Sequence, residues 1–302
     1  METAAASSNS PLDQRLARTL SAVAEQAPDP AGRYAPVPAP VLERIGRRAA
    51  ASYREFLARL SFVGETALAL ARSIAHPARL RWRPILYNIR SAGFDALPIV
   101  GALAFLIGIV VAYQGANTLR QYGANIFVVD LIGLSMLREF APLVTAIIIA
   151  GRSGSAYAAQ IGTMSVTEEI DAMRTVGISP LEMLVLPKVI ALAIVMPLLT
   201  VYADALGVFG GMIMSRSQLG VGFEEFLERF VKAVSITDYM IGIGKAPVFA
   251  AIIALVGCYQ GFRTKGGPDS VGRQTTRSVV EAIFLVIVVD SLFSIALSAL
   301  DL

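Results

Sequence analysis

The stretch ALPIVGALAFLIGIVVAYQGANTL at residues 96–119 decides the fold class of this chain, because none of its 24 residues carries a charge. A helix of about 20 apolar residues crosses the roughly 30 Å hydrocarbon core of a bilayer. Across the whole chain 55% of the residues are hydrophobic and 16% are charged, whereas soluble domains carry about 25% charged residues. The mean hydropathy is +0.62. We therefore expect an all-α polytopic membrane protein.

Four more apolar regions follow this stretch, which gives about five transmembrane helices in total. They are residues 127–150, 189–215, 239–262 and 282–300. The second region is interrupted by Arg138 and Glu139, and the later three contain only Asp204, Lys245 and Asp290, respectively, as charged residues. Each region is long enough to cross a bilayer. The adjacent charges in the second region leave a re-entrant hairpin open as an alternative to a simple span.

Basic residues are distributed unevenly along the chain, and this asymmetry predicts its orientation. Thirteen of the 26 Lys and Arg residues precede residue 95. With five spans, the segments on the N-terminal side carry eleven Lys and Arg residues next to the membrane, and the opposite loops carry four. Cytoplasmic segments are enriched in these residues. We therefore expect a cytoplasmic N-terminus and a periplasmic C-terminus, and the formal net charge of +3 does not indicate nucleic-acid binding.

The region before the first span divides into two parts. Residues 1–40 are rich in Ala, Ser and Pro and predict a disordered cytoplasmic tail. In residues 41–94, apolar side chains recur at helical spacing with arginines between them, and Trp82 and Tyr87 supply aromatic anchors. This pattern favours amphipathic interfacial or elbow helices at the membrane surface. A soluble helical hairpin packed on a partner is the alternative. The transmembrane domain then comprises residues 95–302.

The segment from residue 151 to residue 188 predicts close helix packing followed by a short cytoplasmic helix. Its first part is rich in Gly, Ser and Ala, which let helices approach closely. Ser165 and Glu168 have the spacing of an N-terminal capping box, and Gly177 with Pro180 would end the helix. Val166, Ile170 and Met173 form an apolar stripe. Such a helix is either a solvated linker or a surface that docks on a partner.

Motifs of soluble enzymes are missing from the sequence. There is no Walker A motif, G-x-S-x-G, H-E-x-x-H or C-x-x-C, so we expect no nucleotide hydrolysis by this chain and no catalytic residues. One cysteine, Cys258, and one histidine, His76, exclude a disulfide framework and leave no Cys or His set for a metal. We therefore expect no cofactor and no enzyme activity.

Two long blocks of the chain resemble the MlaE/YrbE family of ABC transporter permeases. The first is LREFAPLVTAIIIAGRSGSAYAAQIGTMSVTEEIDAMRTVGISPLEMLVLPK at residues 137–188, and the second runs from GVFGGMI to GFRTKGGPDSVGRQTTRSVV over residues 207–280. The chain departs from the family pattern at Lys188, where an arginine is usual after the proline, and residues 1–40 have no counterpart.

The resemblance implies a homodimeric permease subunit of the bacterial inner membrane. It would move phospholipids between that membrane and an MCE-domain protein, for lipid homeostasis of the outer membrane. A separate ABC ATPase subunit would hydrolyse ATP, and a STAS-domain protein often joins such complexes. Residues 163–180 would form the coupling helix that meets the ATPase, with Glu168, Glu169, Asp171 and Arg174 as its contact residues.

Arg138 and Glu139 are the leading candidates for contact with lipid, together with Lys245 and Tyr122. Ionisable side chains in hydrocarbon cost several kcal/mol on insertion scales, roughly 2.5–3.5 each, so they face a hydrated cavity or a partner. An arginine there can attract a lipid phosphate. Placement of both residues at the outer interface, where they only fix depth, is the alternative. At the level of function, the alternatives are an ion-coupled secondary transporter that uses Asp204, Lys245 and Asp290, and a non-transporting scaffold.

Overall fold

The computed structural model describes residue 19 and residues 41–75 and 81–300 of the chain, and all regular elements in these ranges are helices. The chain divides into two compact units, residues 1–58 and 59–302. The second unit holds every long apolar helix of the described ranges. The tail predicted for residues 1–40 lies outside the described residues except for residue 19.

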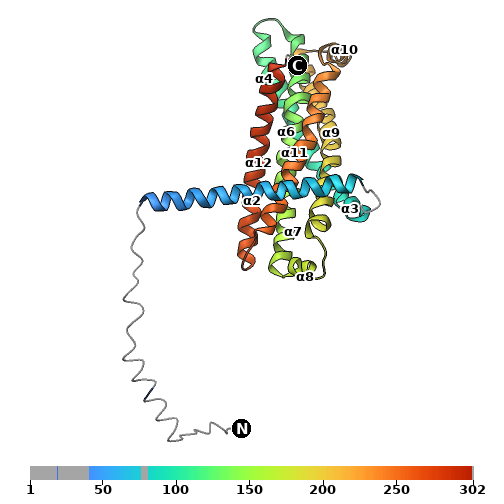
Figure 1. Cartoon of the computed structure of the whole chain (residues 1–302). Helices are drawn as coiled ribbons and strands as arrows, with labels where there is room; N and C mark the ends of the chain where they lie inside the picture. Colours follow the sequence, from blue (N-terminus) through green and yellow to red (C-terminus); the bar gives the residue numbers. More distant parts are fainter. Residues whose placement is uncertain (1–18, 20–40, 76–80, 301–302) are drawn as a thin grey trace, which may run out of the picture. The chain divides into compact units, whose positions relative to one another are not determined.

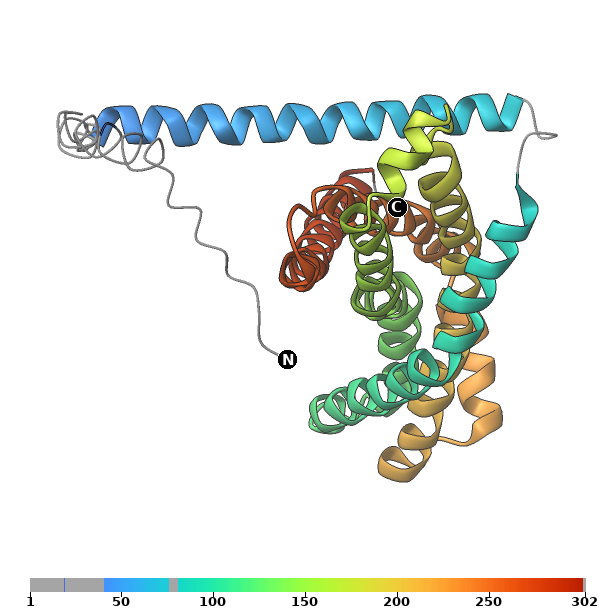
Figure 2. The same cartoon turned by 90° about the horizontal axis from the view of Figure 1, so that it is seen from below.

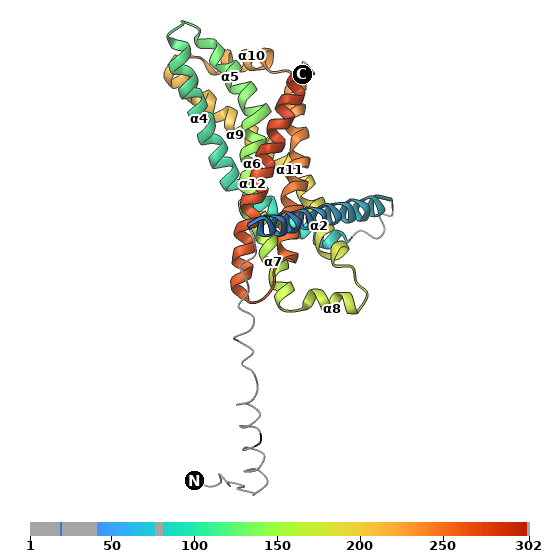
Figure 3. The same cartoon turned by 60° about the vertical axis from the view of Figure 1, so that its left-hand side comes forward.

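Five helical segments of the second unit are long and apolar enough to cross a membrane. They are Trp82–Arg120, Asn125–Val166, Leu181–Leu219, Ile236–Phe262 and Pro268–Ala299. Their main helices α4, α6, α9, α11 and α12 run side by side (Figures 1 and 3). This confirms the all-α polytopic architecture with about five spans. The second segment crosses as one continuous helical run, so the re-entrant alternative is wrong.

Several of these segments are built from consecutive helical pieces. The first contains α3 (Trp82–Ala92), the 3-10 turn η2 (Phe94–Ala96) and α4 (Leu97–Arg120). The second contains η3 (Asn125–Phe127), α5 (Val128–Ser135), the π-helical η4 (Met136–Phe140), α6 (Ala141–Ile149), the π-helical η5 (Ala150–Gly154) and α7 (Ser155–Val166). The third contains the π-helical η6 (Leu181–Val185) and α9 (Leu186–Leu219), and the last two are α11 (Ile236–Phe262) and α12 (Pro268–Ala299). Two short helices connect them: α8 (Glu169–Thr175) and α10 (Phe223–Ala233).

Glycines bring α4 and α9 into backbone contact. A Cβ atom at Gly108 would overlap the backbone of Gly207, and one at Gly210 would overlap the carbonyl oxygen of Phe105. Small residues permit such close approach in membranes, where van der Waals packing replaces the hydrophobic effect between helices. The two helices therefore form a rigid pair in the second unit.

The small residues predicted to allow close packing do so between α11 and the continuous stretch formed by η5 and α7. A Cβ atom at Gly257 would lie 2.8 Å from the carbonyl oxygen of Gly154, and one at Gly261 would lie 2.7 Å from Cβ of Ile161. Within the same helical run, α6 packs on α12 as well as on α4 and α9. The second segment is therefore in contact with the main helices α4, α9, α11 and α12 of the other four candidate spans. Figure 2 shows the helices of the second unit from below.

The predicted amphipathic region forms α2 (Val41–Ala75), which ends just before His76-Pro77, and α3. The part of α2 from Arg59 onward belongs to the second unit, where it contacts α11 and α12. Phe62 packs against Tyr259 and Phe262, with ring centroids 5.5 and 6.0 Å apart, and Arg59 forms an ion pair with Glu281. Trp82 and Tyr87 are exposed on α3, where the prediction places its aromatic anchors.

Candidate functional site

The π-helical turn η4 positions Arg138 and Glu139. A π-turn adds one residue to the helical repeat, and such turns are frequent at functional sites. Leu137 is buried, whereas the side chains of Arg138 and Glu139 are 21% and 32% exposed. Gly242 of α11 lies directly against this turn, because a Cβ atom there would overlap the carbonyl oxygen of Leu137. The turn and the glycine together bring the charged residues of η4 next to α11.

Lys245 of α11 is the centre of the contacts made by these residues. Its Nζ donates to Oε2 of Glu139 at 2.7 Å, to Oδ1 of Asp290 at 3.0 Å and to the carbonyl oxygen of Arg138 at 3.2 Å. An ammonium group has three protons to donate, so all of its hydrogen-bonding capacity is used. Its side chain is 1% exposed. Lys245 thus joins η4, α11 and α12 from inside the helix packing.

Arg138 and Glu139 extend this arrangement in two directions. Arg138 Nη1 donates to Oδ1 of Asp238 at 3.0 Å, near the beginning of α11. Glu139 Oε1 lies 3.7 Å from Nε of Arg138 and accepts a hydrogen bond of 3.0 Å from Ser294 of α12. We call these five ionisable residues the charge cluster: Arg138, Glu139, Asp238, Lys245 and Asp290. With two cations and three carboxylates, its formal charge is −1 when all five are ionised.

The charge cluster is closed at Lys245 and open at Arg138 and Glu139. Removing charges from water is costly even when they pair, so such a cluster is weak evidence for a purely stabilising role. Ionisable residues inside membrane helices commonly mark substrate or ion pathways. The partly exposed guanidinium and carboxylate could contact a ligand that carries both a negative and a positive charge, while Lys245 holds the carboxylate in place. These contacts make the charge cluster the candidate site.

The structure brings together three of the four residues that the sequence predicts for lipid contact. Arg138, Glu139 and Lys245 meet in the charge cluster, whereas Tyr122 lies in the turn between α4 and η3 with 78% of its surface exposed and contributes none of the cluster's contacts. The prediction missed Asp238, which precedes the predicted start of that span. Its spacing of seven from Lys245 was the available signal, because two helical turns bring such residues to one face.

Asp290 and Asp204, which the sequence analysis raised for ion coupling, have different surroundings. Asp290 belongs to the charge cluster through Lys245. Asp204 is buried on α9, and in the described part of the chain neither of its carboxyl oxygens has a hydrogen-bond partner. The three intramembrane charges named for an ion pathway therefore do not form one connected set.

The predicted capping box of the short helix is wrong. Helix α7 continues through Val166, so Ser165 lies inside a helix, and its hydroxyl donates to the carbonyl oxygen of Thr264 at 3.1 Å. Glu168 instead occupies the residue before α8 with a left-handed backbone, φ 60°, and makes no side-chain cap. The hydroxyl of Ser165 is thus used in a contact with the α11–α12 connection and not in a local cap.

The predicted end of this helix is confirmed. Gly177 has φ 80°, its N–H donates to the carbonyl oxygen of Arg174 at 3.0 Å, and that of Ile178 donates to Met173 at 2.9 Å. These two bonds form a Schellman motif, which glycine permits because it has no Cβ penalty in the left-handed region. Ile170 of the predicted apolar stripe is buried and so faces the protein.

The charged residues of α8 lie on its exposed side. Glu168, Glu169, Asp171 and Arg174 are all exposed, and Arg174 Nη1 pairs with Oδ1 of Asp171 at 3.1 Å. A partner that docks on this helix would therefore meet charges, with the exposed Val176 and Ile178 at its end.

Most of the chain is similar to known proteins. Residues 85–296 match the family model described as Permease MlaE. A probable ABC transporter permease protein of Synechocystis sp. is 36% identical over 210 residues, which are 70% of this chain and 80% of the relative. A probable ABC transporter permease protein of Rickettsia typhi is 34% identical over 210 residues, 70% of this chain and 81% of the relative. Protein TRIGALACTOSYLDIACYLGLYCEROL 1, chloroplastic, of Arabidopsis thaliana is 30% identical over 216 residues, 72% and 62% of the two chains.

Replacement of Lys245 by methionine should destabilise the protein by about 3 kcal/mol, because it leaves Glu139 and Asp290 without their buried cation. Lys232→Met on the surface of α10 is the matched control and should have little effect. Adding Asp290→Asn to Lys245→Met should recover much of the loss, because Glu139 keeps Arg138 and Ser294 as partners. Thermal unfolding in detergent measures all three variants. Equal stability of Lys245→Met and the control would contradict the central position of Lys245.

Proposed function

Because this chain belongs to the MlaE family of permeases, we propose that it carries phospholipids between the bacterial inner membrane and an MCE-domain protein, for outer-membrane lipid homeostasis. Membership makes it the multi-pass, non-catalytic subunit of an ABC transporter whose ATPase is a separate chain. The lipid cargo, the membrane, the MCE-domain protein, a homodimeric assembly and a STAS-domain partner are parts of the proposal. The name of the Arabidopsis relative contains that of a galactolipid, which supports a lipid cargo.

The charge cluster is the observation that carries the phospholipid proposal. A phospholipid headgroup brings a phosphate, and many headgroups add an ammonium group. Arg138 can donate charge-assisted hydrogen bonds to the phosphate, and Glu139 can accept from the ammonium. Both side chains are partly exposed while Lys245 and Asp238 hold them in position. Lys245 contributes to the site by orienting Glu139.

Charge distribution at the two ends of the helices supports a cytoplasmic position for α8. The hydrogen bond from Ser165, in the last turn of α7, to Thr264 joins the end of α7 to the α11–α12 connection, so both lie at the same end of the second unit. Basic residues follow at this end: Arg263, Lys265, Arg273 and Arg277. Since cytoplasmic segments are enriched in Lys and Arg, this end is proposed to face the cytoplasm and the opposite end the periplasm.

The proposed ATPase contact on α8 is testable by charge reversal. Glu168→Lys with Glu169→Lys should weaken assembly with the ATPase subunit at least tenfold, because both side chains are exposed on the proposed docking surface. Glu224→Lys with Glu228→Lys on α10 makes the same change of charge at the other end and should assemble normally. Copurification from membranes and ATP-dependent lipid transport are the measurements. Normal assembly and transport of the α8 variant would show that α8 is only a linker.

The proposed lipid contact is testable by photo-crosslinking in cells fed a labelled phospholipid. A photoreactive residue at position 138 or 139 should form lipid adducts, because both side chains are partly exposed. The same residue at Ile253, which is fully buried on α11, should form none and serves as the control. Mass spectrometry of the purified chain identifies the adduct. Adducts elsewhere in the complex together with none at 138 and 139 would refute the proposed contact.

A further inference from the structure

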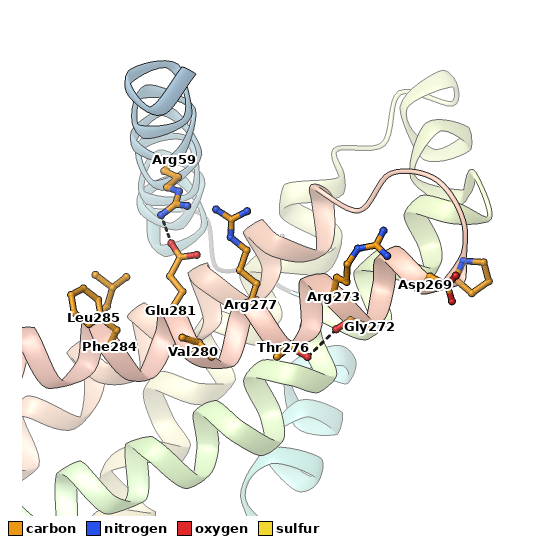
Figure 4. A pocket seen from close by; sticks show the side chains of 11 residues that line it. Arg59, Asp269, Gly272, Arg273, Thr276, Arg277, Val280, Glu281, Phe284 and Leu285 are labelled. Atoms are coloured by element: carbon orange, nitrogen blue, oxygen red, sulfur yellow. Dashed lines mark hydrogen bonds and ion pairs between the residues drawn. The ribbon is translucent and has the colours of Figure 1, made fainter. Parts of the chain in front are cut away.

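A large cavity lies away from the charge cluster, along α12 and beside Arg59 of α2. Its volume is about 1060 Å³ (Figure 4). We call it the α12 groove. Its lining residues are Arg59, Pro268, Asp269, Gly272, Arg273, Thr276, Arg277, Val280, Glu281, Phe284 and Leu285. Along α12, Arg277 and Asp290 are separated by about 20 Å at 1.5 Å per residue, so the groove and the charge cluster are different sites.

One end of the α12 groove is positively charged. Arg59, Arg273 and Arg277 lie along it, and Figure 4 shows Arg277 between Arg273 and the Arg59–Glu281 ion pair. Glu281 already accepts from Arg59 and from the buried Gln260, so its charge is largely compensated. Asp269 is the remaining acidic residue of the groove, and it precedes Arg273 by about one helical turn. Within the described ranges, Arg273 takes part in no ion pair.

The other end of the α12 groove is apolar. Val280 and Phe284 are 64% and 63% exposed and lie beyond Arg277 on the same helix. From Arg277 to Leu285 the helix rises about 12 Å, which is enough to accompany the upper part of an acyl chain. The residues at the beginning of α12 are polar, and those further on are apolar. This change from polar to apolar side chains indicates that the groove lies at one membrane interface.

We infer that the α12 groove binds an anionic phospholipid. The phosphate lies against Arg273 and Arg277, since guanidinium groups form paired, charge-assisted hydrogen bonds with phosphate oxygens. An acyl chain lies along Val280 and Phe284. A headgroup with net negative charge is preferred over a zwitterionic one, because the groove carries three arginines and two carboxylates. The bound lipid fills the space between Arg59 of α2 and α12, and thereby strengthens the attachment of this part of α2.

Photo-crosslinking of the purified transporter complex in vesicles tests this inference. The probe is a photoactivatable phosphatidylglycerol at low mole fraction in phosphatidylcholine vesicles, with unlabelled phosphatidylglycerol, phosphatidylcholine or inorganic phosphate as competitors. Arg273→Gln with Arg277→Gln removes the proposed phosphate contacts. Arg263→Gln with Lys265→Gln removes two charges from the same end of the protein outside the groove. Gly272→Leu keeps all charges and puts a side chain into the groove, which Gly272 lines. The side chain fits there, because a Cβ atom at Gly272 meets nothing within 4 Å.

The expected result is an adduct on residues 268–285 that unlabelled phosphatidylglycerol competes at least fivefold better than phosphatidylcholine. The adduct should fall at least fivefold in the Arg273/Arg277 variant and threefold in Gly272→Leu, and stay within twofold in the Arg263/Lys265 variant. Equal loss in both charge variants would show general attraction to the surface and overturn the site. Competition by millimolar phosphate as strong as by phosphatidylglycerol would make the ligand a free anion. A change in oligomeric state by Gly272→Leu, without loss of the adduct, would make the groove a contact with a second copy of the chain.

Discussion

The buried ammonium group of Lys245 is the contact on which the arrangement of the candidate site depends. It lies within hydrogen-bonding distance of Glu139 on η4 and Asp290 on α12, so one side chain of α11 joins three of the five apolar segments. Bulk water does not reach the ammonium group to replace these partners, because the side chain is 1% exposed. A buried lysine needs carboxylates near it, and here they are Glu139 and Asp290. The bond to Lys245 therefore fixes the orientation of Glu139, and with it the position of the neighbouring Arg138.

Backbone geometry brings these charges together. Gly242 lets α11 approach the π-helical turn η4 until the two backbones touch, and Gly257 does the same against Gly154 further along. The α4–α9 pair repeats this close approach with Gly108 and Gly207. Close helix contacts give the site a rigid frame, which favours a precise orientation of the two exposed charges over a flexible surface.

The sequence predicts the spans well because hydrocarbon thickness imposes a length that composition alone reveals. It also identifies Arg138, Glu139 and Lys245, since charges within apolar runs need an explanation. It does not predict the π-helical turns, because they arise from packing against other helices rather than from local propensity.

Asp238 was missed because α11 begins at Ile236, and a charge near the end of a span has an ordinary explanation at the membrane interface. The capping box failed at Ser165 because a tertiary hydrogen bond to Thr264 replaced the local one. The position of Tyr122 in the sequence shows no helical spacing to the residues of the charge cluster. In the structure it lies in the turn after α4, away from the cluster.

The retained lipid of the purified transporter complex tests most directly the claim that the charge cluster holds a phospholipid. Mass spectrometry should compare two complexes that both carry Arg273→Gln and Arg277→Gln, so that lipid in the α12 groove does not contribute. The second complex also carries Glu139→Gln, Lys245→Met and Asp290→Asn, which remove three charges together so that no buried charge is left unpaired among them. We predict phospholipid above the detergent background in the first complex, and a loss of at least fivefold in the second, provided that it still assembles with the ATPase. Equal phospholipid in both complexes would contradict the claim.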